Sequence, residues 1–343
     1  MRVLVRADAS TSTGSGHVMR CLTLADALAE AGGQIEFVCR AKAGNLIQYI
    51  ERDRGFPVHV LPKQYSAQED AQLTAKFARS GERPDWVVVD HYGLNETWER
   101  QQRPFCERVM AIDDIADRRH DCDLLLDQNL NEFGGRYDEL VPSDCVKLLG
   151  PDYALLRPEF ATIRDGLRER TAKVERLLVN FGGTDPTGET ITSLTQLRGA
   201  PSAQNLQIDL VVGSNQASLA EVVKLAESMT NVKVYVQTPK MAQLMAGADI
   251  GIGAGGSTIW ERCCLGLPTI TVAVADHQVP YCQRLSDLGY ISYAGSALEG
   301  PLDYVAALQG FLQEPDERCK MSRLGMDLVD GRGASRVVEC MLR

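Results

Sequence analysis

An alternation of strand-like and helix-like segments runs through the chain twice, and it constrains the fold more than any other feature. Several strand-like segments are unbroken runs of valine, isoleucine and leucine. Such runs are typical of parallel strands that are buried on both faces of a sheet. The strands predicted for the first half are 2–6, 34–39, 58–61, 86–90, 109–112, 124–126 and 146–150.

The segment 18–31 between the first two strands has apolar residues at helical spacing and ends at Gly32-Gly33. The second half restarts the pattern near Arg176 and continues it to a last helix after Gly333. Its predicted strands are 177–181, 208–212, 233–236, 250–252, 269–274 and 291–293, with helices at 216–228, 241–245, 258–265 and 278–288.

Two such series predict an α/β protein with two doubly wound, Rossmann-like domains that face each other across a cleft. A length of 343 residues is also more than one ordinary hydrophobic core accommodates. We place an N-terminal domain at 1–155, a linker at 156–175, a C-terminal domain at 176–328 and a closing helix at 329–343.

Ligands of open α/β sheets bind outside the carboxyl ends of the strands, which directs attention to a few loops. The loop after the first strand contains Gly14 and Gly16 and ends in His17, at the start of a helix. Glycines let a ligand approach the backbone, and a helix start offers free N–H groups to an anion. A histidine in this place is a candidate base.

Asp90, His91 and Tyr92 follow a predicted buried strand directly. They are placed to orient a sugar or to tune His17, although a plain loop cap by Asp90 explains them equally well. Adjacent carboxylates such as Asp113-Asp114 can share a proton or bind a metal, but consecutive side chains often point apart. The stretch 120–123 has no established metal-ligand spacing, so we predict no metal site and assign the Asp113-Asp114 pair no chemistry.

The second half has two glycine-rich loops of its own, each between a strand and a helix, and together they are suited to wrap a diphosphate. Glu261, about one turn into the following helix, is placed to bind ribose hydroxyls, or it is an ordinary first-turn carboxylate. A third loop ends at His277 and Gln278, where Gln278 is alternatively a simple helix-start residue. The candidate ligand residues of the glycine-rich loops are Gly183, Thr184, Gly256, Ser257 and Thr258.

Composition limits the partners. The formal net charge is −10, which argues against nucleic acid and anionic membranes. No signal peptide opens the chain and no apolar run is long enough to cross a bilayer, so we expect a cytoplasmic protein without stable membrane association. The ten cysteines form no CxxC pair and are expected to be reduced thiols. The oligomeric state stays open.

In combination these residues resemble the UDP-2,4-diacetamido-2,4,6-trideoxy-β-L-altropyranose hydrolases of pseudaminic acid biosynthesis. That family is similar in turn to the peptidoglycan glycosyltransferase that uses UDP-N-acetylglucosamine, and so implies a GT-B-like fold. The segments that carry the resemblance span nearly the whole chain in order: 2–8, 14–17 with Arg20, 89–93, 151–157, 182–185, 256–261 and 330–334.

The resemblance implies a UDP-activated diacetamido sugar as substrate and no cofactor. It assigns the sugar and the attacking water to the N-terminal domain, with His17 as base and Tyr92 in the active site. It assigns UDP to the C-terminal domain, with Glu261 on the ribose. His277 departs from the family, where asparagine is common at this position, so its role stays open.

Three other functions compete with hydrolysis of a UDP-sugar. An inverting GT-B glycosyltransferase with a UDP-N-acetylhexosamine donor has the same architecture and the same histidine. A UDP-sugar 2-epimerase releases no UDP, and a two-lobed binding protein performs no catalysis. Fold alone does not separate these functions.

Overall fold

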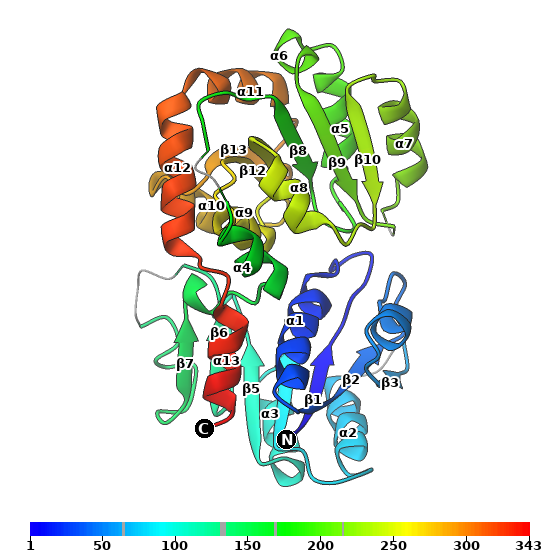
Figure 1. Ribbon diagram of the computed structural model, residues 1–343. Helices are drawn as coiled ribbons and strands as arrows, with labels where there is room; N and C mark the ends of the chain where they lie inside the picture. Colours follow the sequence, from blue (N-terminus) through cyan, green and yellow to red (C-terminus); the bar gives the residue numbers. More distant parts are fainter. Residues whose placement is uncertain (64–65, 131–134, 168–169, 215) are drawn as a thin grey trace. The chain divides into compact units, whose positions relative to one another are not determined.

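The structure is a computed structural model that describes residues 1–63, 66–130, 135–167, 170–214 and 216–343. The chain forms two compact units, each built around a parallel sheet with helices (Figure 1). The first unit comprises residues 1–156 together with 332–343, and the second comprises 157–331. The helix α4 (Pro158–Arg164) of the second unit lies within the segment expected as a linker.

The first unit has a seven-stranded sheet in the order β3-β2-β1-β4-β5-β6-β7, with every neighbouring pair parallel. Its strands are β1 (Arg2–Ala7), β2 (Gln34–Arg40), β3 (Val58–Leu61), β4 (Trp86–Asp90), β5 (Arg108–Ile112), β6 (Leu124–Asp127) and β7 (Val146–Leu149). Its helices are α1 (Gly16–Glu30), α2 (Ala67–Ala78), α3 (Glu96–Gln102) and α13 (Gly333–Met341), with short turns η1 (Tyr49–Asp53), η2 (Arg103–Phe105) and η3 (Pro151–Tyr153).

The end of the chain belongs to the core of the first unit. Helix α13, red in Figure 1, packs against α1 and η3. Its Val337 and Met341 are fully buried, and the indole of Trp86 on β4 donates a hydrogen bond of 3.1 Å to the carbonyl oxygen of Met341. Burial of such side chains contributes roughly 1.5–3 kcal/mol each. The C-terminal helix therefore stabilises the unit with which the chain begins.

The second unit has a six-stranded parallel sheet in the order β10-β9-β8-β11-β12-β13. Its strands are β8 (Arg176–Asn180), β9 (Gln207–Val212), β10 (Val232–Val236), β11 (Ile250–Ala254), β12 (Thr269–Ala273) and β13 (Ser292–Ser296). Besides α4, its helices are α5 (Glu189–Leu197), α6 (Pro201–Gln204), α7 (Leu219–Glu227), α8 (Met241–Gly247), α9 (Thr258–Cys264), α10 (Gln278–Asp287), α11 (Tyr304–Gln313) and α12 (Pro315–Leu328).

The fold class expected from the sequence, two doubly wound α/β units with parallel sheets, is confirmed. The expected start of a helix at Gln216 is wrong: α7 begins at Leu219 because the Gln216 side chain instead donates to Asp185. The last strand lies later than expected, at Ser292–Ser296, and its pairing with β12 is shifted next to Gly295, whose φ is +124°. None of the helices in the described ranges has the length and apolarity to cross a membrane.

A close approach of two backbone segments in the second unit generates a stability prediction. A Cβ on Gly213 would overlap the backbone carbonyl of Gly183, so Gly213→Ala must push apart the loops that follow β8 and β9. We expect a loss of about 2 kcal/mol in the free energy of unfolding. Gly199→Ala, where a Cβ meets open space, is the control and should change stability by less than about 0.5 kcal/mol. Equal urea midpoints for both variants would contradict the prediction.

Candidate functional site

Each sheet has one point at which the strand order reverses, and these points locate the candidate sites. In the first unit the reversal lies between β1 and β4, and in the second between β8 and β11. Loops that leave such neighbouring strands diverge, which opens a crevice at the carboxyl edge of the sheet. His17 follows β1 and Asp90 ends β4, so both lie at the first reversal.

His17 and Asp90 are in direct contact. The Nδ1 atom of His17 lies 2.5 Å from Oδ1 of Asp90, although 73 positions separate the two residues. Arg20, one turn further along α1, donates to both carboxylate oxygens of Asp90, at 2.6 and 2.7 Å. The exposed fractions are 1% for Asp90 and 9% for His17. The arrangement is a buried carboxylate that orients an imidazole.

The charge on Asp90 is secured by its neighbours. Burial alone would raise the pKa of Asp90, but attraction to Arg20 and His17 outweighs it and holds the pKa well below the usual carboxylate range. An ionised Asp90 can only accept hydrogen bonds, so the Nδ1 atom of His17 is the donor. The neutral ring then carries its lone pair on Nε2. His17 is thus prepared to accept a proton at Nε2.

Two of the other histidines have polar partners of their own. The Nε2 atom of His59 lies 2.6 Å from Glu36, on β3 and away from the strand reversal. His91 accepts the backbone N–H of Gly93 at Nδ1, at 2.9 Å, and its Nε2 lies 3.5 Å from Asp8. The sequence placed His91 beside Tyr92 as a further candidate, and its contacts give it a bracing role.

The remaining two histidines are also unlike His17. His120 is buried and pairs through Nδ1 with Glu99, at 2.7 Å. His277 is exposed at the position before α10. All five histidines of the chain lie in the described residues, and His17 is the one that combines a carboxylate on Nδ1 with a place at a strand reversal.

Tyr92 packs on the His17 ring from the side. The two rings meet edge to face with centroids 4.5 Å apart. Burial and the negative charge of Asp114 raise the pKa of the Tyr92 hydroxyl far above its usual value, so the phenol stays protonated. Arg20 reaches Asp114 at 2.8 Å and, against the effect of burial, lowers the pKa of that carboxyl. Tyr92 therefore places a ring with a neutral hydroxyl against the candidate base.

The loop before α1 takes its shape from Gly14, whose φ is +78° and which pairs with Ser10 in a small bridge. Gly16 is the first residue of α1, two positions earlier than the sequence predicted for the start of this helix, so His17 lies within its first turn. A Cβ at Gly16 would meet nothing within 4 Å, which leaves the space beside His17 open.

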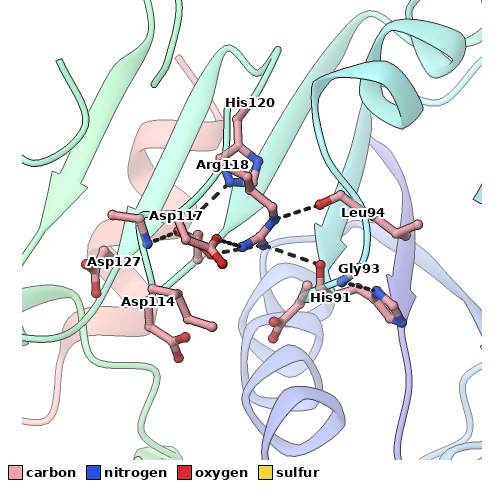
Figure 2. Close-up of polar contacts among 12 residues, drawn as sticks. His91, Gly93, Leu94, Asp114, Asp117, Arg118, His120 and Asp127 are labelled. Carbon is pink, nitrogen blue, oxygen red and sulfur yellow. Dashed lines mark hydrogen bonds and ion pairs between the residues drawn. The ribbon is translucent and has the colours of Figure 1, made fainter. Parts of the chain in front are cut away.

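Residues that the sequence did not single out hold the Tyr92 turn in place. Arg118 donates from Nε to the carbonyl oxygen of Leu94, at 2.9 Å, and from Nη2 to that of His91, at 3.4 Å (Figure 2). The same guanidinium pairs with Asp113 at 2.9 Å and with Asp117 at 2.8 Å. Arg118 thus ties the loop after β5 to the turn after β4, a link that nothing in the local sequence indicates.

The Asp113-Asp114 pair does not act as a unit. Asp113 accepts from the backbone N–H of Ala116 and from the hydroxyl of Tyr137, at 2.8 and 3.0 Å, whereas Asp114 binds Arg20. Across the described ranges, no group of three or more histidine, cysteine or acidic side chains is arranged to hold a metal ion.

A second charged network lies at the carboxyl end of β1, next to the loop that leads to His17. Arg6, fully buried, pairs with Asp8 and Asp70 at 2.6 and 2.8 Å. Asp8 also accepts the backbone N–H of Arg40 and lies 3.2 Å from the Lys42 amine. These opposite charges compensate one another, so the network fixes the end of β1 on which the glycine loop begins.

In the second unit, the loops after β8 and β11 flank the strand reversal. Gly183 and Thr184 follow β8, and Gly256, Ser257 and Thr258 follow β11. Asp185, in the loop after β8, accepts the backbone N–H groups of Glu189 and Thr190 and so caps α5. The structure thus brings the two predicted glycine-rich loops to neighbouring strands of one edge.

The loop after β12 lies against the second of these loops. Gln278 accepts the backbone N–H of Val274 at 2.9 Å, and its amide would lie within 4 Å of a Cβ placed on Gly255 or on Gly256. Glu261 is partly buried, and its carboxylate is 3.9 Å from Arg157. Burial raises the pKa of Glu261, an effect that Arg157 partly opposes. Gln278 and Glu261 therefore border the Gly256–Thr258 segment, and His277 is exposed at the position before α10.

Comparison with known proteins adds independent information. Residues 180–322 match the glycosyltransferase family 28 C-terminal domain. Over 291 residues the chain is 26% identical to the UDP-2,4-diacetamido-2,4,6-trideoxy-beta-L-altropyranose hydrolase of Campylobacter jejuni. The aligned segment covers 84% of this chain and 98% of the hydrolase. The chain resembles this hydrolase along most of its length.

Solved structures agree on the fold. MurG of Acinetobacter baumannii superposes with a TM-score of 0.66 at 14% identity and 99% coverage of each chain. The UDP-GlcNAc 2-epimerase of Neisseria meningitidis, solved with UDP-GlcNAc bound, gives a TM-score of 0.65 at 14% identity and 100% coverage of each chain. The two units therefore have the GT-B-like fold that the sequence predicted.

The depressed pKa of Asp90 generates a prediction about acid stability. Because the folded carboxyl has the lower pKa, its stabilisation is complete above the unfolded value near ~4 and fades as the pH falls below it. Asp90→Asn should lower the free energy of unfolding by about 3 kcal/mol at neutral pH, since the buried Arg20 loses one of its two carboxylate partners. The deficit should shrink toward pH ~3 in urea unfolding.

The control for Asp90→Asn is Asp144→Asn, which alters an exposed aspartate of the same unit. This variant should follow the wild-type stability at every pH. A deficit of Asp90→Asn that is the same at neutral and acid pH would show that Asp90 is not the titrating group.

Proposed function

We propose that the protein hydrolyses a UDP-sugar, UDP-2,4-diacetamido-2,4,6-trideoxy-β-L-altropyranose, to UDP and 2,4-diacetamido-2,4,6-trideoxy-L-altrose. The observation that carries the proposal is the His17–Asp90 contact at the strand reversal of the first unit. The resemblance to the Campylobacter jejuni hydrolase and the match to the glycosyltransferase family 28 domain support an enzyme that processes nucleotide sugars.

In the proposed reaction, Nε2 of His17 accepts a proton from water while the water oxygen bonds to the anomeric carbon. The C1–O bond breaks with inversion, and its electron pair leaves on the β-phosphate of UDP. Asp90 stabilises the imidazolium that forms, as a carboxylate on Nδ1 does in other His–Asp pairs. Tyr92, held against the His17 ring, is placed to orient the water or a sugar substituent.

The proposal needs one base and no opposing acid. Glycosidases that invert use two carboxylates, because an alkoxide is a poor leaving group and must be protonated. UDP leaves as a stable anion, so donors that receive negative charge replace the acid. Gly183, Thr184, Gly256, Ser257, Thr258 and Gln278 are the proposed diphosphate contacts, Glu261 the proposed ribose contact, and Gly14, Gly16 and Arg20 the proposed surroundings of sugar and water. No cofactor or metal is included.

An inverting glycosyltransferase is the second candidate, because the matched domain family and the MurG fold favour it. Its donor would be a UDP-N-acetylhexosamine, and the same base would deprotonate an acceptor hydroxyl in place of water.

The deciding assay measures UDP release from the purified protein in EDTA, with the diacetamido sugar nucleotide and with UDP-N-acetylglucosamine separately. We expect release from the first alone, and ¹⁸O from labelled water should enter the sugar and not UDP. Release only after an acceptor is added would establish the transferase, and conversion to another UDP-sugar would establish an epimerase. Activity that requires a metal would contradict the metal-free mechanism.

A second prediction tests the base. His17→Ala should lower kcat by about 10² to 10⁴, the usual contribution of general base catalysis, without unfolding the unit. His59→Ala is the matched control, because His59 also pairs with a carboxylate in the same unit but lies away from the strand reversal. Equal turnover of His17→Ala and wild type would remove His17 from the mechanism.

A further inference from the structure

Three arginines of the second unit share an unusual property. Burial lowers the pKa of Arg170 and of Arg262 to about 10, and it also lowers that of Arg318. Among the residues that the structure describes, no carboxylate lies within ion-pair distance of these three guanidinium groups. At neutral pH all three remain charged, so each charge needs another source of compensation.

For Arg170 and Arg318 the source is the carboxyl end of a helix. Arg170 donates to carbonyl oxygens at the ends of α8 and α9, including that of Leu265 at 3.0 Å. Arg318 donates to carbonyl oxygens in the last turn of α11, including that of Leu312 at 3.0 Å. Helix C-termini carry partial negative charge, which stabilises a buried cation.

Arg262 lacks this compensation. It is 3% exposed, and its Nη2 donates to the carbonyl oxygen of Ala254, the last residue of β11, at 2.7 Å. Its Nη1 lies 3.3 Å from the hydroxyl of Thr258, the first residue of α9, and its buried Nε has no partner in the described structure. No helix C-terminus is among these contacts. The adjacent Glu261 attracts Arg262 but lies beyond ion-pair distance of its guanidinium, and burial still lowers the pKa of Arg262.

The place of Arg262 explains why its charge matters. A Cβ on Gly253 would lie 2.4 Å from the carbonyl oxygen of Asn180 and 2.6 Å from Nη1 of Arg262, so glycine at position 253 leaves room for the guanidinium. The group sits at the strand reversal, and its two hydrogen bonds end on the residues that bracket the Gly255–Ser257 turn. An unsatisfied buried cation at this point is stabilised by an anion bound to the turn.

We infer that Arg262 is a positioning residue that supplies the counter-charge for a diphosphate bound at the Gly255–Thr258 turn and holds the Thr258 hydroxyl toward it. The inference rests on the proposed function and adds a residue that does not touch the ligand directly. Because the effect is electrostatic, it acts on the phosphates and leaves the nucleoside unaffected.

The experiment measures the dissociation constants of UDP, inorganic pyrophosphate and uridine by calorimetry for the full-length wild type and three variants. Arg262→Gln should weaken UDP binding about 30-fold, as expected for loss of a buried charge interaction, and uridine binding by less than about twofold. Arg262→Lys keeps the charge but loses the planar fork, and should weaken UDP binding about fivefold. Inorganic pyrophosphate should lose affinity in parallel with UDP.

Arg170→Gln is the matched control. Arg170 has the same lowered pKa and, like Arg262, a buried Nε without a partner in the described residues, but it lies beside the amino edge of the sheet. It should lower the melting temperature as Arg262→Gln does but leave the UDP affinity unchanged. Equal weakening of UDP and uridine by Arg262→Gln, or an equal loss of UDP binding in Arg170→Gln, overturns the inference. Absence of UDP binding by the wild type overturns the proposed function, and the inference with it.

Discussion

The carboxylate of Asp90 is the group on which the rest of the candidate site depends. It ends a buried strand and accepts hydrogen bonds from His17 and from the Nε and Nη2 atoms of Arg20. A buried carboxylate is costly without such partners, so its position fixes how α1 lies on β1 and β4. Because His17 and Arg20 are one turn apart on α1, one acid orients the candidate base and neutralises itself with the next turn of the same helix.

The two strand reversals differ in how the charges near them are compensated. In the first unit, opposite charges lie in direct ion pairs: Arg20 pairs with Asp90 and Asp114, and Arg6 pairs with Asp8 and Asp70. Such a site keeps a defined protonation state, as acid–base chemistry requires. In the second unit, glycines bring backbones into contact and one buried cation, Arg262, stays without a counter-charge. That contrast suits a proton-transfer site in one unit and an anion site in the other.

His17 differs from the other histidines of the chain in its position and contacts, and these make it the candidate base. Every other histidine of the chain has carboxylate or backbone contacts that occupy it, or lies exposed at a helix start. The Tyr92 turn, which supplies the neighbouring ring, is held through Arg118 by the loop after β5. The candidate site thus draws on β1, β4 and β5, and on charges that no single segment contains.

The sequence by itself determined the elements and the loops. Unbroken apolar runs predicted nearly every strand, because strands buried on both faces need apolar side chains throughout. Glycines before His17, and at 182–183 and 255–256, marked the loops at the carboxyl edges, because these turns need positive φ or close backbone approach.

Only the tertiary structure decided which side chains meet. The pairing of His17 with Asp90 spans 73 positions, and the clamp of Arg118 on the Tyr92 turn joins two separate loops. The local sequence does not mark Gly213 or Arg262 either. Gly213 matters because the backbone of Gly183 lies against it, and Arg262 matters because its buried charge has no ion-pair partner among the described residues. Periodicity reports which face of an element is buried, whereas a contact depends on strand order, which places distant segments side by side.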